Sequence, residues 1–229
     1  MLLFVIIGIA LAHLRRDEPR GNPLYFRNTV KKSISCTRCV PKICNLDTNN
    51  LDTIVLDLDH TLVHSVRHRD MMDACECPKV QNIQVTDTRI IFIRPMAVAF
   101  LKELRRLNLN IILFTLGSDE YVSQVLDSAN IRDFFSRIYT RRQAFRFNTQ
   151  YCIKCIKDCD ILGDIGDYLI VDDNLAYFGN QNESVMKMKR FSMYNTEDCD
   201  LMAALAVIND IKSGKISKRE GLRLFNGRN

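Results

Sequence analysis

Residues 54–65 read Ile-Val-Leu-Asp-Leu-Asp-His-Thr-Leu-Val-His-Ser, and this stretch decides the fold. Its three leading apolar residues have the form of a parallel strand that is buried on both faces. Asp57 and Asp59 follow at the end of that strand. Two carboxylates two positions apart project to the same side of an extended chain, so a divalent cation or a shared proton has to offset their repulsion. An incidental acidic turn is the alternative for this pattern taken alone.

A second acidic strand end lies far along the chain, where residues 169–174 read Leu-Ile-Val-Asp-Asp-Asn. The carboxyl ends of parallel strands meet at one edge of a sheet, where α/β proteins bind their ligands. Asp57, Asp59, Asp172 and Asp173 are therefore expected close together. Carboxylate oxygens are the ligands that hard cations prefer, so the four residues predict a site of the Mg²⁺ kind.

Further strands and helices alternate along the chain after residue 50. This alternation predicts an α/β fold in which helices flank a central, mostly parallel sheet. The expected strands are residues 54–56, 90–93, 109–114, 138–140, 168–171 and 185–188. The expected helices are residues 97–107, a helix that Ser118 caps, a helix from Thr196 to Ile211 that Gly214 ends, and a short helix opened by the capping box of Ser217 and Glu220.

The domain organisation follows from length and composition. A chain of 229 residues with 47% hydrophobic residues can bury one sizeable core. Residues 1–14 are almost wholly apolar but fall short of the about 20 residues that span a bilayer. They predict either a membrane anchor or a segment buried against the domain or in an oligomer contact. Arg15 and Arg16 follow them, so an inserted anchor keeps the domain on the cytosolic side. The expected divisions are 1–14 as hydrophobic segment, 15–50 as linker, 51–213 as catalytic domain and 214–229 as basic helix and tail.

Charge and cysteine content exclude some classes of protein. The net charge of +5 is too small to predict nucleic-acid binding. Nine cysteines in a chain of this length favour a reducing, intracellular compartment, nucleus or cytoplasm, over secretion. Their clusters allow a zinc site, with reduced buried thiols as the alternative. The clustered residues are Cys36, Cys39 and Cys44, then Cys75 and Cys77, then Cys152, Cys155 and Cys159.

Residues 54–205 resemble the haloacid-dehalogenase-type phosphatases, specifically the branch that contains the small RNA polymerase II C-terminal-domain phosphatases. The first motif differs from that branch at His60, where Glu or Gly is usual. The resemblance implies a Rossmann-like fold with a short β insertion near the active site, and residues 66–89 and 141–152 are the expected counterparts of that insertion. The matching stretches, in the family's order, are residues 55–65, Arg94-Pro95, 112–115, 121–126, Lys157-Asp158 before Leu162-Gly163, and 171–173.

The resemblance also implies a role for each site residue. Asp57 attacks phosphorus and forms an aspartyl-phosphate, while Asp59 serves first as acid and then as base. Of two candidate lysines, Lys157 fits the family's register better than Lys154. The expected catalytic residues are Asp57, Asp59, Thr115 and Lys157, the expected phosphate- or substrate-binding residues are Thr61, Thr115, Lys157, Arg141 and Arg142, and the expected metal ligands are Asp57, Asp59, Asp172 and Asp173.

These expectations predict a Mg²⁺-dependent phosphatase that hydrolyses phosphoserine or phosphothreonine in a protein substrate. One alternative is a phosphatase of small phosphomonoesters or nucleic-acid ends. Another is a catalytically idle binding or assembly protein that keeps the fold, in a viral particle or a membrane complex. The short hydrophobic leader and the many cysteines also resemble phosphatase-like proteins of large insect DNA viruses.

Overall fold

The computed structural model describes residues 46–72, 83–147, 154, 156, 167–178, 183–195 and 197–228. The chain divides into two units, residues 1–34 and 35–229, and every described residue belongs to the second. The apolar segment 1–14, Lys157 and the cysteine clusters lie outside the described residues. In the part of the chain that the structure describes, no helix is long and apolar enough to cross a membrane.

A five-stranded sheet forms the centre of the domain, and all of its pairings are parallel. Its strand order is β6-β5-β1-β7-β8, so the first strand of the sequence lies in the middle. This confirms the α/β class expected from the alternation of strands and helices. The strands are β1 (Thr53–Leu56), β5 (Asn110–Phe114), β6 (Arg137–Tyr139), β7 (Tyr168–Asp172) and β8 (Val185–Lys187).

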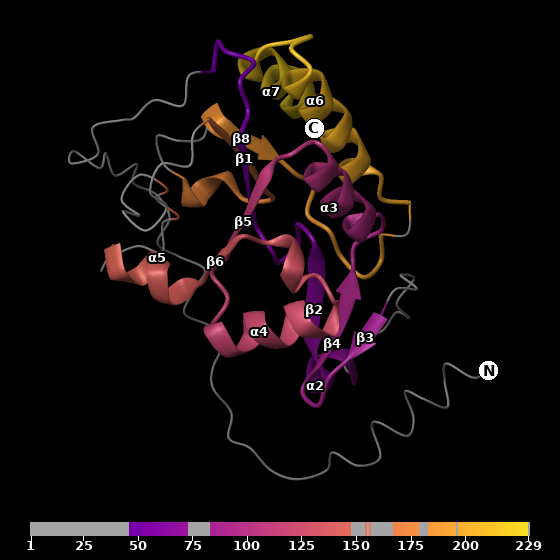
Figure 1. The fold of residues 1–229 in the computed structure, drawn as a ribbon. Coiled ribbons are helices and arrows are strands. Elements are labelled where there is room, and N and C mark those ends of the chain that lie inside the picture. The colour runs from indigo at the N-terminus through magenta and orange to yellow at the C-terminus, as the bar shows by residue number, and fades with distance from the viewer. Residues whose placement is uncertain are drawn as a thin grey trace. The chain divides into compact units, whose positions relative to one another are not determined.

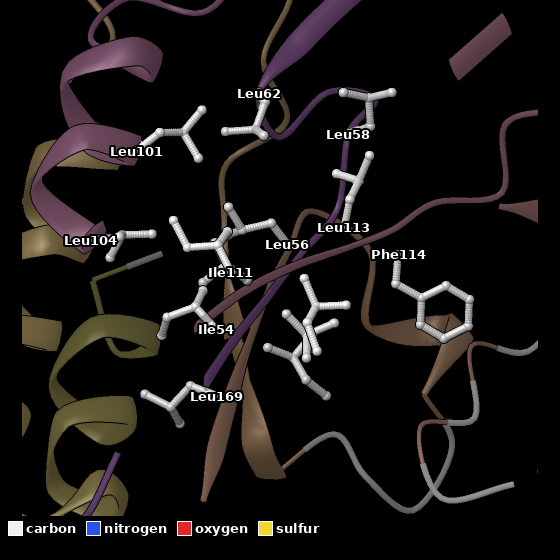
Figure 2. Close-up of a cluster of buried hydrophobic side chains, with 14 of the residues drawn as sticks. Ile54, Leu56, Leu58, Leu62, Leu101, Leu104, Ile111, Leu113, Phe114 and Leu169 are labelled. Atoms are coloured by element: carbon white, nitrogen blue, oxygen red, sulfur yellow. The ribbon is translucent and has the colours of Figure 1, made fainter. Parts of the chain in front are cut away.

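Helices flank this sheet, with α3, α6 and α7 grouped together and α4 and α5 placed apart from them (Figure 1). The apolar face of α3 packs on the sheet because its leucines recur at helical spacing. Leu101 and Leu104 point toward Ile54 of β1 and Ile111 of β5 in Figure 2, and all four are buried. The helices are α3 (Ala97–Arg106), α4 (Asp119–Ser128), α5 (Arg141–Phe147), α6 (Asp200–Lys212) and α7 (Lys218–Asn226), with 3₁₀ turns at Arg132–Phe134 and Leu175–Tyr177.

Most of the predicted helix boundaries are confirmed by their caps. The Ser118 hydroxyl accepts a hydrogen bond from the backbone N–H of Tyr121 at 3.3 Å, and Ser217 accepts one from the N–H of Glu220 at 3.2 Å. Gly214 follows α6 with a φ of 76°, a conformation that glycine adopts at low cost. Helix α6 begins at Asp200, later than the sequence predicts.

Three further strands form a separate antiparallel sheet between β1 and α3 in the chain. The order is β2-β4-β3, with β2 at Val63–Arg67, β3 at Ile83–Val85 and β4 at Arg89–Ile93, and α2 (His68–Met72) follows β2. The strand expected at residues 90–93 therefore exists but belongs to this insertion, not to the central sheet. Burial of Ile90, Phe92, Phe191 and Met193 in one small cluster anchors the inserted sheet to the segment after β8. The expected β insertion is confirmed for residues 66–89, whereas in the second expected segment residues 141–147 form helix α5.

Residues 214–229, which the sequence sets apart as helix and tail, include part of the main core. Leu222 and Phe225 of α7 are buried with the core residues of α6 and the central sheet. The fully buried Lys218 ammonium lies 2.9 Å from Asp167, just before β7. The backbone of α7 also bonds residues 46–48, through Lys218 N–H to Thr48 and Arg219 N–H to Leu46. The apolar pattern of α7 is too short to predict this burial. Packing and backbone hydrogen bonds join α7 and residues 46–48 to the domain.

Candidate active site

Three neighbouring strands bring the expected site residues to one edge of the central sheet. Leu56 is paired with Leu113 of β5 on one side and with Val171 of β7 on the other. The next residues along these strands are Asp57, Phe114 and Asp172. The backbone N–H of Asp57 donates to the Val171 carbonyl at 3.0 Å, which continues the ladder. Register therefore places the Asp57 and Asp172 side chains next to each other, because paired residues of parallel strands project to the same face.

Lys154 joins these two carboxylates. Its ammonium donates hydrogen bonds to Asp57 Oδ1 and, at 2.6 Å, to Asp172 Oδ2. The side chains of all three residues are almost fully buried. A buried charge of this kind is stable only when it is paired and hydrogen-bonded. The chain therefore fixes a lysine directly beside the expected nucleophile.

The electrostatics of this cluster are unbalanced. Burial alone lowers the pKa of the Lys154 ammonium, but the charges of Asp57 and Asp172 outweigh it and raise that pKa, so the lysine stays protonated. Burial, reinforced by repulsion from Asp57, raises the pKa of Asp172 to about 7. Burial also raises the pKa of Asp173, with Asp57 again adding to the shift. The single buried ammonium of Lys154 does not neutralise the three carboxylates of Asp57, Asp172 and Asp173.

A divalent cation fits this donor set. Asp57, Asp172 and Asp173 each offer a carboxylate oxygen, and the three oxygens lie within 4.8 Å of one another. Hard oxygen ligands and excess negative charge are what Mg²⁺ requires. The Arg190 guanidinium lies 3.5 Å from Oδ2 of Asp173 and is largely exposed. Three of the four expected metal ligands are thus brought together by their side chains.

The fourth expected metal ligand, Asp59, lies two residues beyond Asp57. Its carboxylate accepts a hydrogen bond from a residue of α4. The Tyr121 hydroxyl donates a hydrogen bond to Asp59 Oδ1. Burial raises the pKa of the Asp59 carboxyl, although the bond from Tyr121 acts in the opposite direction. A raised pKa suits a carboxyl that must carry a proton near neutral pH.

The end of β5 supplies polar groups on the other side of Asp57. Thr115 is buried, and its Oγ accepts a hydrogen bond from the Gly117 N–H at 3.1 Å, which leaves its own proton free to be donated. The exposed Arg141 donates from Nε to the Leu116 carbonyl at 2.6 Å, so it lies against the same turn. Arg142 pairs instead with Asp119 at 3.0 Å. Of the two arginines expected to bind substrate, only Arg141 contacts the turn beside Thr115 in the described structure.

Thr61 is fully buried, and its hydroxyl has no hydrogen-bond partner among the described residues. Its expected contact with phosphate stays a prediction. The next helix, α4, is capped by Ser118, so the Thr115 hydroxyl is not used as a helix cap.

Two histidines tie the motif loop to the segment after β8. His60 has a φ of 64°, the left-handed conformation of a tight turn, and its Nδ1 lies 2.9 Å from the Phe191 carbonyl. His64 Nδ1 accepts from the Met193 N–H at 2.9 Å. Burial lowers the pKa of His64 to about 4, with contributions from nearby positive groups. His64 is therefore the neutral tautomer that accepts at Nδ1, and both rings hold the loop in place.

Sequence reasoning missed two neighbours of the site. Tyr121 begins the stretch 121–126 that resembles the family, but nothing in the sequence gives it a role at the site, and nothing marks Arg190. For the lysine, the family's register favours Lys157, which lies outside the described residues. The lysine that contacts Asp57 and Asp172 is Lys154, the other candidate in the sequence.

Substitution of each lysine distinguishes the two assignments. We expect Lys154→Ala to lower kcat/KM for a phosphomonoester by about 10²- to 10³-fold, the usual loss when one group that stabilises transition-state charge is removed. Lys157→Ala serves as the matched comparison and is expected to retain most of the activity. Steady-state kinetics on p-nitrophenyl phosphate measure both. A large loss in Lys157→Ala with little loss in Lys154→Ala would reverse the assignment.

Comparisons with known proteins identify the family of this chain. The family model of the NLI interacting factor-like phosphatases matches residues 52–218. A variant of the fission yeast RNA polymerase II CTD phosphatase Fcp1 bound to beryllium fluoride is similar at 14% identity and a TM-score of 0.46, over 79% of this chain and 52% of that one. A structure of Fcp1, an essential RNA polymerase II CTD phosphatase, is similar at 17% identity and a TM-score of 0.46, over 78% and 54%.

A protein from Thermotoga maritima assigned as a β-phosphoglucomutase is similar at 9% identity and a TM-score of 0.42, over 77% of this chain and 99% of that one. No curated protein matches the chain. The chain spans about half the length of the two Fcp1 chains. The family model covers well over half of the present chain, from just before β1 to the start of α7. The chain therefore belongs to the NLI interacting factor-like phosphatases, a branch of the haloacid-dehalogenase-type phosphatases.

Proposed function

We propose that this protein is a Mg²⁺-dependent phosphatase that removes phosphate from phosphoserine or phosphothreonine in a protein substrate. The observation that carries the proposal is the Asp57, Lys154 and Asp172 cluster, in which a carboxylate at a strand end is held by a fully buried ammonium. Unlike the buried pair of Lys218 and Asp167, this cluster gathers the carboxylates of Asp57, Asp172 and Asp173 at one ammonium, a crowding of negative charge that costs the fold free energy. A nucleophilic carboxylate has to be oriented and kept ionised, and an ammonium bound to Asp57 does both.

In the first step, Asp57 attacks phosphorus and the bond to the ester oxygen breaks. The departing oxygen takes a proton from Asp59, which gives the free hydroxyl and an aspartyl-phosphate on Asp57. Lys154 and the hydroxyl of Thr115 act on the negative charge of the transferring phosphoryl group.

In the second step, Asp59 acts as base and takes a proton from the water that attacks the same phosphorus. The bond to Asp57 breaks and inorganic phosphate leaves. Mg²⁺ held by Asp57, Asp172 and Asp173, and by Asp59 through its backbone carbonyl, would neutralise phosphoryl charge while it is bound.

The surroundings of the site favour an extended anionic substrate. Arg141 contacts the turn after β5 and Arg190 follows β8, two strands that lie on opposite sides of β1, and both side chains are exposed. Guanidinium groups bind phosphate through paired hydrogen bonds. A peptide that carries acidic or phosphorylated residues next to the scissile phosphate can use both arginines, whereas a small phosphomonoester reaches only the centre.

Substrate panels and metal removal test this proposal. We expect phosphate release from phosphoserine and phosphothreonine peptides to stop when EDTA removes divalent cations and to return when Mg²⁺ is added. We expect kcat/KM on these peptides to exceed that on nucleotides and on 5′-phosphorylated oligonucleotides by about tenfold, the value of one charge-assisted contact. Equal rates without divalent cations would contradict the metal assignment. A preference for nucleotides or oligonucleotides would contradict the protein substrate, and no turnover of any of these would point to an idle assembly protein.

A further inference from the structure

A series of contacts leads from the inserted sheet through Tyr121 to Asp59. The Arg89 guanidinium on β4 donates from Nη1 to the Ser65 hydroxyl on β2 at 3.1 Å. The Ser65 hydroxyl also acts on the Tyr121 hydroxyl, whose pKa it lowers. The Tyr121 hydroxyl donates to Asp59 Oδ1. The Arg89 guanidinium carbon also lies 4.6 Å from the centre of the Tyr121 ring, so the ring is held from its face as well as from its hydroxyl.

The chemistry of these groups fixes the direction of their hydrogen bonds. An arginine guanidinium has donors only, so the Ser65 oxygen must accept from it. The Ser65 hydrogen is then free to point toward the Tyr121 oxygen, while the Tyr121 hydrogen is donated to Asp59. Asp59 Oδ1 is consequently an acceptor whether the carboxyl is ionised or protonated.

We propose that Tyr121 is a positioning residue that keeps Oδ1 of Asp59 occupied, so that the proton given to the leaving group is carried only by Oδ2. Without the Tyr121 hydroxyl, the proton can rest on either oxygen and the carboxyl can rotate, so a smaller share of the acid faces the departing oxygen. The inference rests on the proposed function, because it assigns a purpose to Asp59 as acid.

The contacts of Tyr121 join two parts of the fold, the inserted sheet and α4. Ser65 and Arg89 lie on the insertion between β1 and α3, whereas Tyr121 lies on α4. Tyr121 is placed in the first turn of α4 by the cap from Ser118 to its own backbone N–H. The inserted sheet therefore contributes to the site, because its Arg89 contacts the Tyr121 side chain that binds Asp59.

The test uses two substrates whose leaving groups need the acid to different degrees. Phenol has a pKa close to that of tyrosine, about 10, and leaves poorly without a proton, whereas p-nitrophenolate leaves well. We expect Tyr121→Phe to lower kcat/KM for phenyl phosphate by about tenfold or more, and for p-nitrophenyl phosphate by less than about threefold. This ratio reports proton donation to the leaving group, which a merely structural loss does not change.

Two further variants complete the experiment. Tyr194→Phe removes a hydroxyl beside the same inserted sheet that, in the described structure, is not hydrogen-bonded to Asp59, and it is expected to change the ratio of the two substrates by less than about twofold. In an Asp59→Asn background, Tyr121→Phe is expected to have no further effect on the ratio, since the acid that it positions is gone.

An equal loss on both substrates in Tyr121→Phe, or a full additional loss in the Asp59→Asn background, would overturn the inference. Failure of the parent protein on both substrates has another meaning, because it would overturn the proposed phosphatase activity itself.

Discussion

Replacement of Asp57 by Asn is expected to reduce phosphate release from p-nitrophenyl phosphate by about four orders of magnitude or more, the usual effect of removing a covalent nucleophile. The amide keeps the shape of the side chain but does not attack phosphorus. Colorimetric release of p-nitrophenol at saturating Mg²⁺ measures the effect directly.

The same variant should fold normally. It removes one of the carboxylates that repel one another around Lys154, and the oxygen of the new amide can still accept from the ammonium, which now forms its ion pair with Asp172 alone. Chemical denaturation should therefore give a free energy of unfolding at least as large as that of the parent. Asp70→Asn, on the exposed face of α2, is the matched control and should keep full activity. Equal activity of Asp57→Asn and the parent would contradict the mechanism.

Replacement of Arg94 by Met is expected to lower the free energy of unfolding by about 3–5 kcal/mol, the cost of leaving one member of a buried ion pair alone. The fully buried guanidinium donates to both carboxylate oxygens of Asp198, at 2.9 and 2.7 Å. It also donates to the carbonyls of Thr61 at 3.0 Å and of Lys189 at 3.1 Å. One side chain thus joins the motif loop, the segment after β8 and the approach to α6.

Denaturation by urea, followed by circular dichroism, measures this loss. Arg106→Met is the matched control, because its pair with Glu103 is exposed and such pairs contribute about 0–1 kcal/mol. Addition of Asp198→Asn to Arg94→Met should restore part of the stability, since the unpaired buried charge is then removed. A loss below about 1 kcal/mol in Arg94→Met, or no recovery in the double variant, would contradict the role given to this pair.

The Arg94 network also explains why the start of α6 was predicted too early. Residues 196–198 carry good helix-opening signals, Thr followed by Glu and Asp. Asp198 is taken up by Arg94, a residue 104 positions away, and the helix begins only at Asp200. Helix-opening residues report only the conformation that a segment prefers in isolation. The buried ion pair of Arg94 and Asp198 contributes more free energy than that preference and therefore decides where the helix begins.

The strand at residues 90–93 gives a second example. Its apolar run correctly predicts a strand, but periodicity does not say which sheet a strand joins. Backbone pairing with Val63–Arg67 and contact with Phe191 and Met193 assign it to the inserted sheet. Such partners come from tertiary packing, because a hydrophobic run is compatible with more than one buried surface.

The sequence by itself determined the α/β class, the caps of α4 and α7, and the carboxylates at the ends of β1 and β7, because these depend on short-range periodicity and on strand ends that share one edge. Only the tertiary structure decided which lysine meets Asp57 and which groups orient Asp59. Lys154 is 97 residues from Asp57, and Tyr121 is 62 residues from Asp59. At such separations a contact depends on how helices, strands and loops pack against one another. Lys154 and Lys157 are only three residues apart, so the sequence does not show which of them is buried beside Asp57.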